Sequence, residues 1–264
     1  MSIGAYTIVK NEAFWIGPYL ASWLPWLDQI SLFDGNSTDG TLDTIKDFQN
    51  NHPQGHKIKL VEDKDPKDLQ HDYVRIFNEC MWALNTDWAA FLHPDMLPVN
   101  PEAIKNIDDG IAHFCHVDSY AGDPGGQLYK IDGRATRWKN IYRLRNPDIG
   151  AHYYGFYGHA DEDTYFEAIT GDEHKHHGEE FHRYPYEVKD AGLRIMHFSD
   201  VRPHARRLQR MKACMVNQDK EPSLIDELAE NHPRVTLQSG YGFKFTPAEY
   251  PEIFKTWRKH PCSL

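Results

Sequence analysis

Three stretches of the sequence carry acidic, amide or imidazole side chains directly after a short apolar run. They are residues 10–12 after the run 6–9, residues 34–39 after the run 29–33, and residues 93–95 after the run 88–92. Carboxylates such as Glu12, Asp34 and Asp95 accept hydrogen bonds from hydroxyl and N–H groups, and they are hard ligands that suit Mg²⁺ and Mn²⁺. The side chains therefore suit a nucleotide and a divalent cation. A strand that merely ends in a polar turn is the simpler alternative for each stretch taken alone.

The apolar patterns predict the elements that position these side chains. They indicate strands over 6–9, 29–33, 57–61 and 88–92. Helices are expected between them, over 13–28, over the residues after Asp39, and over 66–84. Asp39 can cap the second of these helices. Strands that alternate with helices are typical of a mostly parallel sheet flanked by helices. In such sheets, ligands bind outside the carboxyl ends of the strands. We therefore expect the three polar stretches to form one site.

The pattern beyond residue 100 is less regular. We predict a helix over 101–109, a strand over 111–117, a glycine-rich loop over 118–134, an antiparallel strand over 135–144, a strand over 193–198 and a basic helix over 202–214. Four histidines between residues 174 and 182 lie among acidic residues, which predicts a solvated loop, with a zinc site as the alternative.

Composition limits the class of protein. Of the 264 residues, 40% are hydrophobic and 26% are charged, which is typical of a soluble globular protein. No apolar run approaches the roughly 20 residues of a spanning helix, so we expect no transmembrane segment and a cytoplasmic location, with a position peripheral to a membrane as the alternative. The net charge of -10 argues against broad nucleic-acid binding. The four cysteines form no CxxC pair, which predicts reduced thiols.

Four motifs, in this order, resemble those of inverting family 2 glycosyltransferases, which have a GT-A fold. They are TIVKNE at 7–12, DGNSTDGT at 34–41, DWAAFLHPDM at 87–96 and MHFSDVRP at 196–203. The resemblance covers about residues 3 to 210. It implies a glycosyltransferase domain over 1–210, with a nucleotide-sugar half over about 1–100 and an acceptor half over about 101–210. Residues 211–264 are then expected to form a C-terminal helical appendage.

The resemblance also implies roles for single residues. The base and ribose of a nucleotide sugar, with UDP as the expected nucleotide, would be bound by Val9, Asn11, Glu12 and Asp34. The cation, Mn²⁺ or Mg²⁺, would bind Asp95 and bridge the diphosphate.

The motif around Asp95 departs from the family's DxD pattern. His93 replaces the first aspartate and Met96 replaces the acidic residue that follows the second. His93 is expected near the ribose or the metal, and the site carries less negative charge than usual. His197 resembles a ligand that completes the cation site in some relatives. A histidine held at a strand end, without a cation, is the alternative for His197.

Inverting transfer needs a carboxylate that takes the proton from the acceptor hydroxyl. The family's acidic pair is matched by residues 159–163, so the base is expected to be Asp161 or Glu162, with Asp163 next. An acidic helix start stabilised by the helix dipole is the alternative. Arg202 would offset the diphosphate charge, or else lie on a solvated helix face.

The predicted function is transfer of a sugar from a nucleotide sugar to a hydroxyl group on a saccharide, a lipid or another acceptor. A modified nucleobase in DNA is an alternative acceptor. A second alternative is a non-catalytic member of the fold that only binds a nucleotide. A nucleotidyltransferase is disfavoured because no glycine-rich, lysine-bearing phosphate loop follows the first strand.

Overall fold

The computed structural model describes residues 1–61, 73–107, 112–122, 126–132, 136–143, 188–201 and 244–257. Several sequence predictions lie outside these ranges. They are the candidate bases Asp161, Glu162 and Asp163, the histidines of 174–182, and Arg202 with its basic helix.

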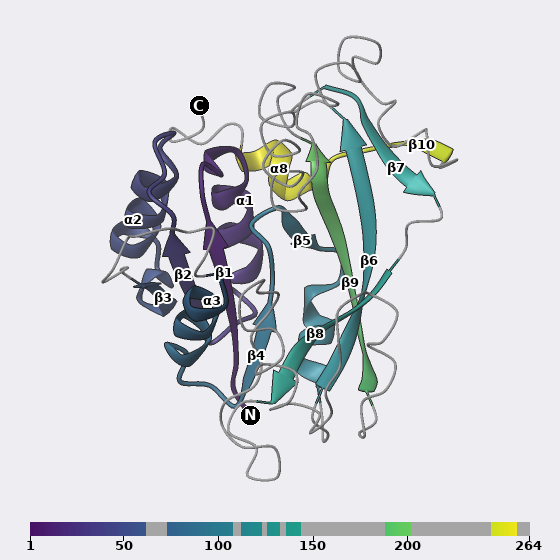
Figure 1. The fold of residues 1–264 in the computed structure, drawn as a ribbon. Coiled ribbons are helices and arrows are strands. Elements are labelled where there is room, and N and C mark those ends of the chain that lie inside the picture. Colours follow the sequence, from purple (N-terminus) through teal and green to yellow (C-terminus); the bar gives the residue numbers. More distant parts are fainter. Residues whose placement is uncertain are drawn as a thin grey trace, which may run out of the picture.

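The N-terminal half forms an α/β sheet whose strands are all parallel (Figure 1). Its elements are β1 Ile3–Val9, α1 Ala13–Trp23, β2 Gln29–Asp34, α2 Thr41–Asn51, the 3-10 turn Gly55–Lys57, β3 Ile58–Val61, α3 Tyr73–Trp82 and β4 Trp88–Phe91. The strand order is β4-β1-β2-β3. The predicted α/β fold with a parallel sheet flanked by helices is confirmed in this half.

Alternating side chains of the strands bury the sheet on both faces. Ala5 and Val9 of β1 pack in one cluster with Trp15 and Leu20 of α1, while Tyr6 packs in a second cluster with residues of α3. This is the period of two that a strand imposes on its side chains. Helices α1 and α3 therefore cover opposite faces.

The remaining strands extend the sheet with mainly antiparallel pairs. They are β5 Met96–Pro98, β6 Ala112–Gly122, β7 Leu128–Asp132, β8 Thr136–Arg143, β9 Val188–Val201 and β10 Lys244–Ala248. The full order is β10-β7-β6-β8-β4-β1-β2-β3, and β9 pairs in parallel with β6 and antiparallel with β5. The long strands β6 and β9 lie side by side in Figure 1.

Two local predictions for this half need correction. The segment 118–134 is not one glycine-rich loop, because β6 continues to Gly122 and pairs with β7 as a hairpin. Gly122 has φ 151°, and a Cβ there would clash with the Gln127 carbonyl oxygen, so this position at the end of β6 requires glycine. The predicted helix over 101–109 is right in position but of another type, because Pro101–Asn106 forms a 3-10 helix; residues 108–109 lie outside the described ranges.

The expected C-terminal helical appendage is not supported by the described part of that segment. Strand β10 pairs with β7 at the sheet edge. Phe254 of α8, Glu252–Trp257, is buried, with its ring 5.0 Å from that of Phe14 and 5.3 Å from that of Trp15. This segment therefore adds a strand to the sheet and an aromatic side chain to the core.

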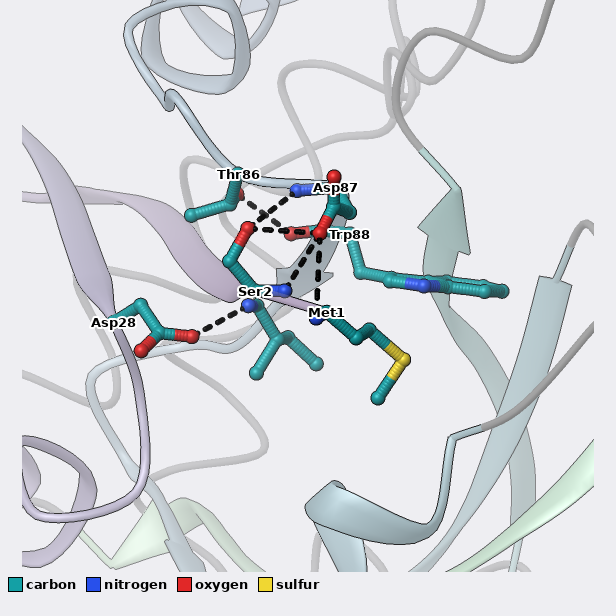
Figure 2. Close-up of polar contacts among 7 residues, drawn as sticks. Met1, Ser2, Asp28, Thr86, Asp87 and Trp88 are labelled. Carbon is teal, nitrogen blue, oxygen red and sulfur yellow. Dashed lines mark hydrogen bonds and ion pairs between the residues drawn. The ribbon is translucent and has the colours of Figure 1, made fainter.

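The amino end of β1 is fixed between its two neighbouring strands (Figure 2). Asp87 accepts hydrogen bonds from the Ser2 N–H at 2.7 Å and the Ser2 hydroxyl at 3.0 Å, and Asp28 accepts one from the Ile3 N–H at 2.8 Å. These carboxylates precede β4 and β2. They hold the register of the three central strands at their amino ends, opposite the carboxyl ends where the polar stretches lie.

Two lysines satisfy carbonyl groups that helix ends leave without intrahelical partners. Lys57 Nζ donates to the Leu24 and Leu27 carbonyls at 3.0 and 2.8 Å, beyond the end of α1, and Lys59 Nζ donates to the Ala83 carbonyl after α3. Terminal carbonyls of helices need such donors.

Among the helices that the structure describes, none is long and apolar enough to cross a membrane.

Lys57→Met is expected to lower the free energy of unfolding by about 1.5–3 kcal/mol, because two hydrogen bonds from a charged donor are lost at a half-buried site. Lys59→Met is the matched control, since its single bond is exposed and should be worth less than about 1 kcal/mol. Urea unfolding measures both variants. Equal losses in the two would contradict this role for Lys57.

Candidate functional site

The predicted polar stretches lie at one edge of the sheet. Val9 is paired with Asp34 at the carboxyl ends of β1 and β2, and Tyr6 is paired with Phe91, so the chain after β4 leaves the sheet at the same edge. Strands β2 and β4 flank β1, which places them roughly 10 Å apart. The loops after β1, β2 and β4 therefore surround one position.

The loop after β1 is bound to the loop after β2 by a set of hydrogen bonds. Four of them run from Asn11 N–H to Ser37 Oγ at 2.8 Å, from Thr38 N–H to Asn11 Oδ1 at 2.7 Å, from Glu12 N–H to Thr41 Oγ1 at 2.7 Å, and from Ala13 N–H to Asp39 Oδ2 at 3.1 Å. Asp39 was predicted to cap α2. It precedes the N-cap residue Gly40, accepts from the Thr41 N–H, and also binds the first residue of α1.

Asn11, a predicted nucleotide contact, has a structural role in this loop pair. Its φ of 54° lies in the left-handed region, which asparagine tolerates better than most residues. Its side-chain oxygen is bonded to the Thr38 N–H. The amide oxygen therefore orients the loop that follows Asp34, the last residue of β2.

Asn11→Ala is expected to lower the free energy of unfolding by about 2–3 kcal/mol, because it removes the hydrogen bond to Thr38 and places alanine at positive φ. Asn11→Gly removes only the hydrogen bond, so about 1 kcal/mol is expected. Chemical denaturation compares the two. Equal losses would show that the backbone conformation of Asn11 carries no strain for alanine.

Asp34 presents one bonded and one unbonded oxygen. Oδ2 accepts a hydrogen bond from the Ser37 N–H at 3.0 Å. Oδ1 is buried and has no hydrogen-bond partner within the described residues. An unsatisfied buried carboxylate oxygen is costly, and it is typical of a position that a ligand donor fills.

The other predicted nucleotide contacts are Val9 and Glu12. Val9 is fully buried, its side chain belongs to the core, and its carbonyl accepts from the Gly35 N–H at 2.7 Å. Glu12 is half-buried at the start of α1. Val9 therefore lies beside Asp34 and contributes its backbone rather than its side chain to this edge, whereas the Glu12 N–H is bonded to Thr41.

Asp95 and His197 come together although 101 residues separate them in the chain. Asp95 Oδ1 lies 3.4 Å from His197 Nε2, and the two residues are only 1% and 8% exposed. Strand β9 brings His197 opposite Met96 of β5, and the Phe198 N–H donates to the Asp95 carbonyl at 2.9 Å. The pair is thus fixed by backbone pairing on both sides.

His93 completes this group of side chains. Its ring lies parallel to that of His197, with centroids 5.8 Å apart, and edge-on to Phe91 at 4.6 Å. Met96, which replaces an acidic residue of the family motif, is fully buried in the hydrophobic core. The methionine that replaces the acidic residue therefore contributes to the packing of the core.

The Asp95 and His197 atoms fit adjacent positions around a divalent cation. Ligands of an octahedral ion at 2.0–2.1 Å are about 3 Å apart, close to the 3.4 Å between Asp95 Oδ1 and His197 Nε2. Across the described ranges, no group of three or more histidine, cysteine, aspartate or glutamate side chains is arranged to hold a metal. A cation here would take two protein ligands from this pair and its others from a bound phosphate or water.

Sequence reasoning missed several residues that build this site. Ser37, Thr38 and Thr41 supply the loop contacts, and the tryptophans of α1 hold the backbone near Asp95 and His197. The density of serine and threonine in residues 37–41 was the available signal for the first group. Nothing in the local sequence indicates that the tryptophans bind these strands.

No protein-family model matches the chain, and no curated protein matches it by sequence. Solved structures do match. TarS from S. aureus, residues 1–349, is 14% identical with a TM-score of 0.46, and the match covers 86% of this chain and 68% of TarS. The mannosyltransferase PcManGT from Pyrobaculum calidifontis, in complex with GDP-Man and Mn²⁺, is 14% identical with a TM-score of 0.44, covering 81% of this chain and 62% of that one.

Glucosyl-3-phosphoglycerate synthase from Mycobacterium tuberculosis, in complex with Mn²⁺ and UDP-glucose, is 19% identical with a TM-score of 0.29. This match covers 47% of this chain and 44% of the synthase, so the chain spans less than half of that protein. These three matches have identities of 14–19% and TM-scores below 0.5.

Proposed function

We propose that this protein transfers a sugar from a nucleotide sugar to an acceptor hydroxyl with the help of a divalent cation. One arrangement carries the proposal. Asp34, at the end of β2, has a buried oxygen with no partner among the described residues, and Asp95, next to His197, lies in the segment that follows β4. Strands β2 and β4 flank β1 and end on the same side of the sheet. A nucleoside diphosphate is long enough to contact both places.

The nucleoside would bind at the loop pair after β1 and β2. A carboxylate is a pure acceptor, so Asp34 Oδ1 suits a ribose hydroxyl or a base N–H. The oxygen is covered in this structure, so a ligand must displace the covering atoms to reach it. Asn11 and Ser37 hold the surrounding backbone, which makes the acceptor position rigid. UDP is the proposed nucleotide.

The diphosphate would bind beside Asp95 and His197. A Mn²⁺ or Mg²⁺ ion held there supplies charge stabilisation to the departing diphosphate. His93 replaces an aspartate, so this site has one carboxylate where the family motif has more, and its imidazole neighbours suit Mn²⁺ better than Mg²⁺. Mn²⁺ is therefore the proposed ion.

The acceptor side is proposed from the sequence motifs. Asp161 or Glu162, with Asp163 next, would take the proton from the acceptor hydroxyl during inverting transfer, and Arg202 would offset diphosphate charge. The acceptor would be a saccharide, a lipid or a modified nucleobase. Residues 1–210 are proposed as the transferase domain and 211–264 as a C-terminal segment that adds β10 and α8 to it.

A thermal-shift screen of nucleotides and nucleotide sugars, each with and without Mn²⁺, tests the proposal. A ligand at 100 times its dissociation constant adds about 2.7 kcal/mol of stability, which raises the melting temperature by roughly 5–10 °C. We expect this shift for a nucleotide diphosphate or its sugar, larger with Mn²⁺ than without. If no nucleotide shifts the melting temperature, the proposed site is wrong.

A non-catalytic nucleotide-binding protein is the second candidate, because His93 and Met96 depart from the catalytic motif and Met96 is buried in the core. The nucleotide sugar that stabilises the protein most is then incubated with it and Mn²⁺. Release of free nucleotide, by transfer or by hydrolysis, favours the transferase. Tight binding without any release favours the second candidate.

A further inference from the structure

Two indole groups of α1 donate hydrogen bonds to backbone carbonyls, one directly after Asp95 and the other four residues after His197 on β9. Trp23 Nε1 donates to the Met96 carbonyl at 2.8 Å, and Trp15 Nε1 donates to the Val201 carbonyl at 3.3 Å. Trp15 also stacks on Phe198, the neighbour of His197, with centroids 4.7 Å apart and an angle of 21° between the rings. The two indoles are eight residues apart, about 12 Å along the helix.

The hydrogen-bond pattern of β5 and β9 explains why the Met96 carbonyl needs Trp23. The Asp95 carbonyl accepts from the Phe198 N–H, and the Arg194 carbonyl accepts from the Val99 N–H. Bonded and non-bonded pairs alternate in an antiparallel ladder, so Met96 and His197 face each other as a non-bonded pair. The Met96 carbonyl therefore points away from β9.

A buried carbonyl that points away from its partner strand must find another donor. Met96 and Trp23 are both fully buried, and the Trp23 indole N–H is the donor. Because Asp95 immediately precedes Met96, this bond fixes the backbone from which the Asp95 carboxylate projects. On the other strand, Trp15 fixes the backbone after His197 at Val201 and packs against Phe198.

The same helix is bound to the nucleotide loops at its other end. Its first residue, Ala13, donates its N–H to Asp39 of the loop after β2. Helix α1 therefore connects the loop pair around Asp34 with β9, which carries His197, and with β5, which begins directly after Asp95. Figure 1 shows α1 running between the parallel strands and β5.

We propose that Trp23 is a positioning residue that fixes Asp95 relative to His197 through the Met96 carbonyl. The part of this inference that concerns cation binding rests on the proposed function. The part that concerns the geometry of the Asp95–His197 pair does not. Trp23→Phe keeps an aromatic ring at this position but has no N–H. Among natural residues it is therefore the replacement that best isolates the loss of the hydrogen bond.

The test compares Trp23→Phe with Trp88→Phe in the full chain. Trp88 is equally buried, but it begins β4 at the opposite edge of the sheet, so its replacement controls for the loss of a core indole. Two quantities are measured on each variant. The first is the NMR resonance of the His197 Cε1–H group, assigned with His197→Gln, and the second is the affinity for Mn²⁺ in the presence of UDP, measured by electron paramagnetic resonance.

Trp23→Phe is expected to shift the His197 resonance as much as Asp95→Asn does, and to weaken Mn²⁺ binding by about 10–100-fold, the usual effect of losing a supporting group of a metal site. Trp88→Phe is expected to change neither. Unchanged resonance and affinity in folded Trp23→Phe would overturn the inference, and so would equal changes in Trp88→Phe. If the wild-type protein binds no Mn²⁺ with UDP, the proposed cation site fails, and the resonance alone decides whether Trp23 positions the pair.

Discussion

Asp95→Asn is expected to reduce Mn²⁺-dependent release of nucleotide from the sugar donor by at least about 10²–10³-fold. This is the usual loss when one electrostatic group that stabilises developing charge is removed from a buried site. The Asp95 carboxylate lies 3.4 Å from His197, and Asp95 is 1% exposed. Asparagine keeps the shape and removes the negative charge that holds the ion against the diphosphate.

The matched control is Asp190→Asn. Asp190 also lies beside a histidine, with Oδ2 2.8 Å from His116 Nε2, but this pair is exposed. Asp190 lies on the same strand as His197 and seven residues before it, roughly 23 Å away along β9. Activity of Asp190→Asn should therefore stay within about twofold of the wild type, because an exposed ion pair contributes little.

The rate of nucleotide release is measured for both variants over a range of Mn²⁺ concentrations. Excess Mn²⁺ should restore part of the activity of Asp95→Asn if the defect is in metal affinity. Full activity of Asp95→Asn at low Mn²⁺ would remove Asp95 from the mechanism. An equal loss in Asp190→Asn would mean that the effect is not specific to the proposed site.

The parallel half of the fold could be predicted because its sequence is locally regular. Residues 6–9, 29–33 and 88–92 are apolar runs followed by polar loops, and helices with apolar stripes separate them, so each element could be assigned from its own residues. In the antiparallel half, the glycines near residue 122 suggested a loop. The register of β6 with β7 and β9 is set by pairing that a local pattern does not contain.

Single residues of the site could be predicted from the sequence, but the contacts between them could not. Asp34 ends β2 and Asp95 lies in the segment that follows β4, so the topology alone places them at one edge. The approach of His197 to Asp95 was expected only from the resemblance. It depends on the pairing of β9 with β5, two strands that are far apart in the sequence. The α1 tryptophans look like ordinary core residues in the sequence, since an apolar stripe does not reveal where an indole N–H donates.

Asp34→Asn is expected to weaken UDP binding by roughly 10–150-fold while leaving the stability of the free protein unchanged or slightly raised. A hydrogen bond to a charged group contributes about 1.5–3 kcal/mol, which corresponds to this range of affinity. Asparagine retains an acceptor for the Ser37 N–H. It also removes a buried charge whose second oxygen has no partner in the described residues, so folding loses nothing.

Asp39→Asn, on the same loop, is expected to change stability more than UDP affinity, the opposite of Asp34→Asn. Its two oxygens accept from the Ala13 N–H and from the Thr41 N–H and hydroxyl, so all its bonds are structural. We expect it to lower the free energy of unfolding by about 1–2 kcal/mol, because an amide replaces one of these acceptors with a donor. Its effect on UDP affinity should be smaller than that of Asp34→Asn.

Isothermal titration with UDP and urea unfolding, performed on both variants, separate the two roles. A site built for a ligand holds a group that is unfavourable until the ligand arrives, and this is the property that distinguishes Asp34 from Asp39. Loss of stability in Asp34→Asn with unchanged UDP affinity would show that its Oδ1 atom serves the fold alone. The nucleotide would then have to bind without this carboxylate, and the proposed site would lose its nucleoside half.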